Sequence, residues 1–318
     1  KETSGIAPRI VGLSATLPNP LDVSKFIGAD PDSGLLVFGE EYRPIPLQQT
    51  YFGIKGSLTS VEKAASQSKA MCDCVIETLS KSKQVLLFVH SRNKTLKVAK
   101  FLREQLFKRG MADYLQKKTP DKELQQKSRL FKEVELRELI LNGIGIHHAG
   151  MIRTDRTRIE SLFKSKGIQI IVCTATLAWG MNLPAHTVII HGTEIYDSRQ
   201  GGYVHMSPLD VLQIFGRAGR PGFDKTGHGI IITSEEKVKQ YVRALTHSTK
   251  IESCMMVDLP DHLNAEIARM SINSTRDAMK WMGHTFLWCR LQTNPFAYGI
   301  TAQELRNDRD LHFFRLNI

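Results

Sequence analysis

The chain has 318 residues, of which 42% are hydrophobic and 24% are charged. Length and composition therefore fit about two folded domains and exclude a disordered or fibrous protein. Lysine and arginine number 43 against 32 aspartates and glutamates, a net charge of +11 that favours polyanionic partners such as nucleic acids. No apolar run approaches the roughly 20 residues of a membrane span, no apolar leader opens the given sequence, and the five cysteines are scattered. We therefore expect a soluble intracellular protein, nuclear or cytoplasmic, without a membrane partner.

The first 54 residues combine short predicted elements with an extended segment. An apolar run predicts a strand at 9–13, and a helical pattern follows at 21–27. Residues 35–54 contain Pro44 and Pro46, and proline favours extended geometry in the residue before it. We therefore expect this segment to be a connector between two domains.

From about residue 66, apolar strand patterns alternate with helical patterns that have apolar residues at spacings of three and four. The strand candidates are continuous apolar runs, which are typical of strands buried on both faces of a parallel sheet. They lie at 84–90, 145–148, 169–173, 187–191 and 229–233. This alternation predicts an α/β fold with a doubly wound parallel sheet, in which ligands bind beyond the carboxyl ends of the strands.

Two further patterns lie outside the predicted sheet. Two glycines at 201–202, flanked by aromatic and β-branched residues, predict a β-hairpin over 194–206. After residue 251 the strand patterns stop, and one capped helix is predicted over 274–291 and another from residue 301 onward. The C-terminal part of the chain is therefore predicted to be helical.

The most informative segment begins with Ser-Pro at 207–208, which is typical of a helix start. If that helix continues, Gln213, Arg217 and Arg220 lie within about 60° of one another on one face, and Gly216 leaves room beside them. Guanidinium groups bind phosphate oxygens bidentately and stabilise a transferring phosphoryl group. We expect the two arginines to face a gap at the carboxyl edge of the sheet where a triphosphate would bind. The alternative is a surface helix with two solvated arginines.

This segment resembles the sixth motif of superfamily 2 helicases, Gln-x-x-Gly-Arg-x-Gly-Arg, and other motifs occur in the order of that family. Ser14-Ala-Thr16 resembles motif III, and 88–92 resembles motif IV. The sequence His-His-Ala-Gly-Met at 147–151 matches a signature of the superkiller-type branch, whose motif V resembles 174–185. Each match alone is weak, but the ordered set is specific. The chain is therefore identified as a member of that branch, similar to its large two-cassette helicases.

The resemblance implies a RecA-like fold and a division into three parts. Residues 1–46 would be the end of a first RecA-like domain and a linker, residues 47–250 a second RecA-like domain, and residues 251–318 part of a winged-helix domain. The implied function is that of the second motor domain of an ATP-dependent helicase that moves 3′ to 5′ along RNA or DNA. The motifs do not distinguish between the two nucleic acids.

The resemblance also implies roles for individual residues near the nucleotide. Arg217 and Arg220 would be arginine fingers for ATP, supported by Gln213. Three residues would lie near the nucleotide: Gly180, Asn182 and Gly216. In motif III, Ser14 and Thr16 would couple nucleotide state to movement.

A second group of residues would contact nucleic acid. Six would hold the strand backbone without reading its sequence: Ser91, Arg92, His148, Gly150, Thr174 and Thr176. The two threonines would fit strand-end capping nearly as well. In the predicted hairpin, Tyr196 and Tyr203 would stack as a strand-separating wedge, although the hairpin would also fit simple packing on the domain edge.

No metal site is predicted from the cysteines and histidines. Cys72 and Cys74 lie in a helical pattern and point to different faces, and Cys173 belongs to a buried strand. The histidines at 147–148 are not followed by a second pair at ligand spacing.

Two motor motifs do not occur in the given sequence. It contains neither a Gly-Lys-Ser/Thr phosphate loop nor an Asp-Glu pair for the metal ion. We therefore expect ATP with Mg²⁺ to bind only together with a first RecA-like domain, and expect the chain alone, as a piece of a larger ATPase, to be inactive. Implied partners are RNA or DNA, that first domain, and a multi-subunit complex. The alternative is a non-catalytic module of the same fold that binds nucleic acid or acts as a scaffold.

Overall fold

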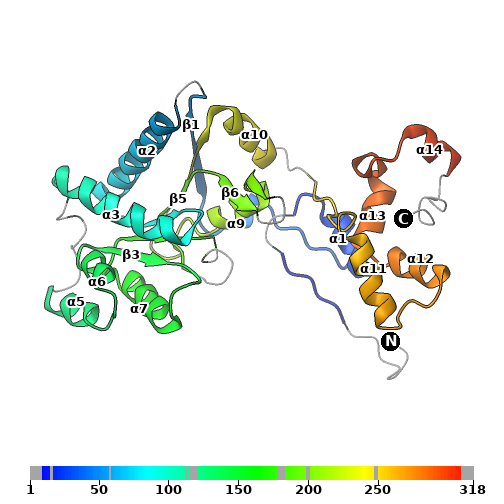
Figure 1. Cartoon of the computed structure of the whole chain (residues 1–318), viewed down its shortest axis with the longest axis horizontal. Helices are drawn as coiled ribbons and strands as arrows, with labels where there is room; N and C mark the ends of the chain where they lie inside the picture. The colour runs from blue at the N-terminus through cyan, green and yellow to red at the C-terminus, as the bar shows by residue number, and fades with distance from the viewer. Residues whose placement is uncertain are drawn as a thin grey trace. The chain divides into compact units, whose positions relative to one another are not determined.

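The computed structural model describes residues 9–14, 17–56, 59–111, 114, 121–175, 177, 183–197, 201–246 and 250–308. The chain forms two compact units (Figure 1). The larger unit comprises residues 40–247, and the smaller one comprises residues 1–39 together with 248–318.

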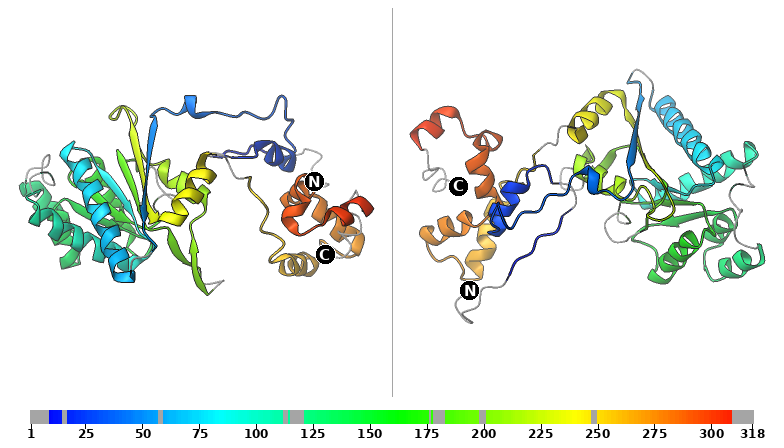
Figure 2. Two further views of the ribbon diagram at one scale, coloured as in Figure 1. Left: turned by 90° about the horizontal axis from the view of Figure 1, so that it is seen from above. Right: turned by 180° about the vertical axis from the view of Figure 1, so that it is seen from behind.

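The larger unit is built on a parallel sheet of six strands, in the order β1-β8-β5-β2-β4-β3. The strands are β1 (Leu47–Ile54), β2 (Val85–Phe88), β3 (Ile144–His147), β4 (Ile170–Cys173), β5 (Thr187–His191) and β8 (Gly227–Ser234). The fold class predicted from the apolar runs is confirmed, and the five predicted strands form with bounds that differ by at most two residues at either end. The central strands are buried because helices cover the sheet on both faces (Figure 2).

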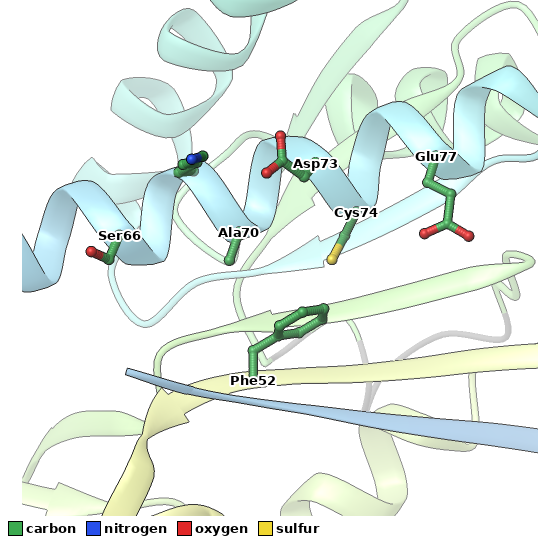
Figure 3. Close-up of a pocket in the computed structure, with 7 residues that line it drawn as sticks. Phe52, Ser66, Ala70, Asp73, Cys74 and Glu77 are labelled. Atoms are coloured by element: carbon green, nitrogen blue, oxygen red, sulfur yellow. The ribbon is translucent and has the colours of Figure 1, made fainter. Parts of the chain in front are cut away.

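Helices alternate with the strands in the described part of the larger unit, as the sequence pattern predicts. They are α2 (Ser60–Ser80), α3 (Arg92–Lys108), α5 (Asp121–Ser128), α6 (Val134–Leu141), α7 (Arg153–Lys164), α9 (Pro208–Phe215) and α10 (Glu235–Thr246), with a 3-10 turn η1 (Glu40–Tyr42). Neighbouring residues on β1 show the two covered faces. Phe52 points towards α2 (Figure 3), whereas a side chain at Gly53 would meet Glu235 and Val238 of α10.

Two N-terminal expectations are wrong. Residues 47–54 of the expected connector form β1, which pairs with β8 along its whole length; as an edge strand it is half exposed and therefore lacks an apolar run. Residues 9–13 do not form a strand. Ile10 and Leu13 are exposed, and the described residues include no neighbouring strand that could accept the backbone hydrogen bonds of this segment.

The predicted hairpin over 194–206 is confirmed as β6 (Glu194–Asp197) and β7 (Gly202–His205), which pair antiparallel. Gly201 has a φ of 63° in the turn between them. This left-handed backbone conformation favours glycine.

The smaller unit is helical in its described part. Its elements are α1 (Pro20–Ile27), α11 (Leu259–Ala268), α12 (Thr275–Gly283), α13 (Phe286–Thr293), the 3-10 turn η2 (Pro295–Tyr298) and α14 (Ala302–Asn307). The single helix predicted over 274–291 is wrong: it begins after the Ser274 cap but breaks at His284, because Thr285 caps a new helix by accepting a hydrogen bond from the Trp288 N–H. The predicted helix after Thr301 forms up to Asn307, and its further course lies outside the described residues. No helix in the described part of the chain is long and apolar enough to cross a membrane.

Candidate functional site

Most of the residues predicted to hold the nucleic-acid backbone follow the carboxyl ends of three neighbouring β-strands. We call them the strand-backbone residues, after the nucleic-acid strand. Ser91 and Arg92 follow β2 and begin α3, His148 and Gly150 follow β3, and Thr174 follows β4. Because β2, β4 and β3 are adjacent and parallel, these segments emerge at one edge of the sheet. The structure therefore places this group on one edge.

The side chains of Arg92 and His148 both lie close to Gly150. A Cβ at Gly150 would lie 3.1 Å from Arg92 Cδ, 3.2 Å from Arg92 Nη1 and 3.2 Å from His148 Nδ1. Any residue larger than glycine would therefore displace the guanidinium group or the imidazole ring. Thr174 lies beside this loop, since its backbone N–H donates to the His147 carbonyl oxygen at 3.2 Å.

The edge is suited to bind anions. Burial and the nearby cations Arg92 and Arg156 lower the pKa of His148, so its ring is neutral at pH 7. The Ser91 side chain caps α3 by accepting a hydrogen bond from the Lys94 N–H at 3.2 Å. The backbone N–H groups at a helix start attract phosphate, and Arg92 adds a permanent positive charge.

Sequence reasoning missed Arg156, which lies in the first turn of α7. Its Nε atom is buried and has no hydrogen-bond partner among the described residues. It acts electrostatically on both His147 and His148. Its position close behind the double histidine was visible in the sequence, but a single basic residue near a helix start is too common to be distinctive.

His147 is part of the packed core of this unit. Its Nε2 atom lies 2.9 Å from Glu160 Oε1, and burial lowers its pKa. Among the described residues, no group of three or more His, Cys, Asp and Glu side chains could hold a metal ion.

The hairpin presents an aromatic pair. Tyr196 and Tyr203 are opposite each other in the β6–β7 register. Their ring centroids lie 5.6 Å apart at an interplanar angle of 75°. The side chains are 62% and 74% exposed, so two edge-to-face rings are open to a stacking partner.

The prediction that Gln213, Arg217 and Arg220 share one helical face at the carboxyl edge is wrong in two respects. The first is the length of the helix. α9 ends at Phe215, so Arg217 and Arg220 follow it in a turn rather than continuing one helical face. Gln213 is exposed on α9, and Gly216 caps the helix through its N–H bond to the Leu212 carbonyl oxygen at 2.8 Å. Arg217 is half-buried, and burial lowers its pKa.

The second difference is the edge of the sheet on which Arg220 lies. Its Nε donates to Asp224 Oδ2 at 2.8 Å and its Nη1 to Gln84 Oε1. Gln84 immediately precedes β2, and Asp224 lies shortly before β8. Arg220 therefore lies at the amino edge in a nearly buried ion pair, because the chain after α9 returns to the start of β8.

Asp224 holds two cations at this edge. Its fully buried carboxylate also accepts a hydrogen bond from Lys83 Nζ at 2.7 Å. Burial alone would raise the pKa of Asp224, but hydrogen bonds from Arg220 and Lys83 outweigh it and lower the pKa to about 2. The exposed Phe223 ring lies 5.9 Å from the Arg220 guanidinium carbon.

Four predicted site residues lie outside the described part of the chain: Thr16, Thr176, Gly180 and Asn182. Ser14 is exposed in an irregular segment of the smaller unit. A separate hollow of about 300 Å³ between β1 and α2 (Figure 3) shares no residue with either edge group.

Comparisons with known proteins agree with the motif analysis. Residues 142–222 match the helicase conserved C-terminal domain, and residues 252–313 match a winged helix-turn-helix domain. Over 96% of its length the chain is 45% identical to activating signal cointegrator 1 complex subunit 3 of Rattus norvegicus. Over 98% of its length it is 43% identical to the U5 small nuclear ribonucleoprotein 200 kDa helicase of Homo sapiens. It spans 14% of the length of each of these relatives. The chain therefore belongs to the superkiller-type branch of superfamily 2 helicases, with a RecA-like helicase C-terminal domain followed by a winged-helix domain.

Proposed function

We propose that this chain acts as the second motor domain of an ATP-dependent helicase that moves 3′ to 5′ along RNA or DNA. The observation that carries the proposal is the close grouping of Arg92, His148 and Gly150 at the carboxyl edge of the sheet. A permanent cation beside a helix start fits a backbone phosphate. Such contacts hold a strand without reading its bases.

The other strand-backbone residues complete this surface. Ser91 and Thr174 carry hydroxyl groups at the same edge of the sheet, and the family motif predicts that Thr176 joins them. Arg156 extends the positive charge along α7. Tyr196 and Tyr203 would stack against the last base pair of a duplex, because aromatic faces stack on any base.

The nucleotide half of the proposal concerns the amino edge. Arg217 and Arg220, supported by Gln213, would contact the phosphates of ATP held with Mg²⁺ by a first RecA-like domain, near Gly180, Asn182 and Gly216. Asp224 accepts hydrogen bonds from Nε and Nη2 of Arg220 and so fixes the direction of the guanidinium group. The chain alone would neither bind ATP tightly nor hydrolyse it, because its sequence contains no phosphate loop.

We infer the partners and the location from the same family. Nucleic acid and a first RecA-like domain would be the direct partners, and Ser14 and Thr16 would couple the two motor domains. The names of the relatives include a complex subunit and a small nuclear ribonucleoprotein, which supports a multi-subunit complex and a nuclear location for this chain too.

Strand binding can be tested with the chain as it stands. We expect Arg92→Ala to weaken binding of a fluorescent 12-nucleotide single strand, and to reduce the slope of log affinity against log salt by about 0.7, the value for one phosphate contact. Arg129→Ala is the matched control, since it removes the same charge from an exposed position after α5. Equal losses in the two variants would show that only net charge matters and would contradict the site.

A non-catalytic module is the second candidate, and the ion pair between Arg220 and Asp224 favours it, because a structural arginine would be held in this way. The test is to mix the chain with a separately expressed first RecA-like domain and to measure ATP turnover. Turnover that Arg220→Ala abolishes supports the motor. Turnover that Arg220→Ala leaves unchanged rules out its role as an arginine finger.

A further inference from the structure

His90 connects the carboxyl edge of the sheet, where the strand-backbone residues lie, to the β6–β7 hairpin. It lies between the end of β2 and Ser91, and its Nε2 atom is 2.7 Å from the carbonyl oxygen of Gly192. A carbonyl oxygen only accepts hydrogen bonds, so Nε2 carries the proton and donates it. Burial lowers the pKa of His90, so the ring is a neutral donor at pH 7.

Gly192 lies at the root of the hairpin, between β5 and β6. Its φ is 83°, and a Cβ there would have the His90 ring as its nearest neighbour, at 3.9 Å. Its N–H donates to the Ile232 carbonyl oxygen of β8 at 2.9 Å. The same peptide segment is therefore held by β8 on one side and by His90 on the other.

Thr193, the residue after Gly192, bonds to β7, the second strand of the hairpin. Thr193 Oγ1 lies 2.6 Å from Thr233 Oγ1 of β8 and 3.1 Å from His205 Nδ1 of β7. The Met206 N–H donates to the Thr193 carbonyl oxygen at 2.9 Å. The β6 end of the hairpin is thus bonded directly to β8, and the β7 end is bonded to Thr193 at the same root.

We propose that His90 is a positioning residue that fixes the spacing between the strand-backbone site at Arg92 and the stacking pair Tyr196 and Tyr203. The inference rests on the proposed function, because it assumes a strand at Arg92 and a base pair at the tyrosines. With a fixed spacing, a nucleic-acid strand held at Arg92 enters the duplex at the same place on the hairpin each time the motor advances. The first base pair of the duplex then always meets the tyrosine rings. Without the His90 link, the strand still binds, but the junction is no longer held against the rings.

The test uses the full chain and a forked duplex with a 3′ single-stranded arm, carrying 2-aminopurine in the first base pair. Stacking on tyrosine changes the fluorescence of this base. We expect His90→Ala to reduce the fluorescence change on binding by at least half while the single-strand affinity stays within twofold. His90→Gln retains a donor at a similar position and is expected to restore the signal. His228→Ala is the matched control, because it removes a ring bonded to Thr50 on the opposite edge of the sheet.

The outcomes separate this inference from the proposed function. If Tyr203→Ala abolishes the signal and His90→Ala leaves it intact, the positioning role is wrong and the wedge stands. If the wild-type chain gives no signal, or Tyr203→Ala leaves it intact, the wedge fails and the positioning role fails with it. Should His90→Ala not fold, His90→Phe keeps the ring volume without the donor, and an intact signal in that variant would equally overturn the inference.

Discussion

The buried ion cluster of the smaller unit allows the sharpest stability prediction. Arg290 on α13 is 0% exposed. Its Nη1 donates to Asp22 of α1, and its Nη2 and Nε donate to the two oxygens of Glu252 at 2.6 and 3.0 Å. Hydrogen bonds from Arg290, and further ones from Asn294 and Tyr298, lower the pKa of Glu252 to about 2. One guanidinium group therefore joins three segments of the chain.

We expect Arg290→Met to destabilise the smaller unit by about 3–5 kcal/mol, because it leaves a buried carboxylate without its cation. The unpaired carboxylate of Asp22 accounts for most of this cost, since its side chain is only 9% exposed. Replacing Asp22 by Asn in the same chain should recover part of the loss, so a double-mutant cycle should give a coupling of about 1–3 kcal/mol.

Urea unfolding followed by hydrogen exchange measures this effect. The loss should appear in α1 and α13 and leave β2 and β5 of the larger unit unchanged. Arg269→Met is the control, because its pair with Glu266 is 3.6 Å long and its side chain is 76% exposed, so the cost should stay below about 1 kcal/mol. Equal costs for the two variants, or an effect spread over both units, would refute the reasoning.

Two further predictions concern the amino edge of the sheet. The pKa of Asp224 is lower in the folded chain than its ordinary value of 3.8, so its contribution of about 2 kcal/mol is present above pH 4 and is lost as the pH falls towards 2. Urea unfolding at several acidic pH values should show a shallower loss for Asp224→Asn, and identical acid dependence would contradict this. Gly219→Ala should destabilise the larger unit by about 2 kcal/mol or more, because φ is 89° and the new Cβ would lie 2.5 Å from Ile45 Cγ2. Gly222→Ala, with a similar φ but open space, should cost about half as much, and thermal unfolding of both variants checks the difference.

The strands at the centre of the sheet were predictable because burial on both faces imposes continuous apolar runs. β1 was not predictable in this way, since an edge strand with residues such as Gln48 and Gln49 needs no apolar run. The break between α12 and α13 had a visible signal, because Thr285 is a common cap residue, but Trp281 and Phe286 continued the apolar pattern across it. Local propensity therefore predicted where helices begin better than where they end.

The candidate site was predictable where residues follow the strands directly. Arg92 and Thr174 follow predicted strands and His148 is the last residue of one, so the parallel topology was sufficient to bring them to one edge. The edge predicted for Arg220 is wrong because ligands bind beyond the carboxyl ends of strands, whereas the segment with Arg220 leads into the amino end of β8. The packing of Gly219 against Ile45, and the bond between Arg290 and Asp22, join residues far apart in sequence and had no local signal.

The two candidate sites lie at opposite ends of one strand. Gln84, just before β2, binds Arg220, and His90, just after it, binds Gly192. Gln84 and His90 are six positions apart, about 20 Å in an extended chain, and all four residues of β2 are at most 1% exposed. A strand packed closely on both faces resists rearrangement, whereas coupling between sites requires an element with two states. If Arg220 meets a nucleotide as proposed, its effect would therefore reach the bound strand through movement of the larger unit as a whole, and not through a change of shape within its sheet.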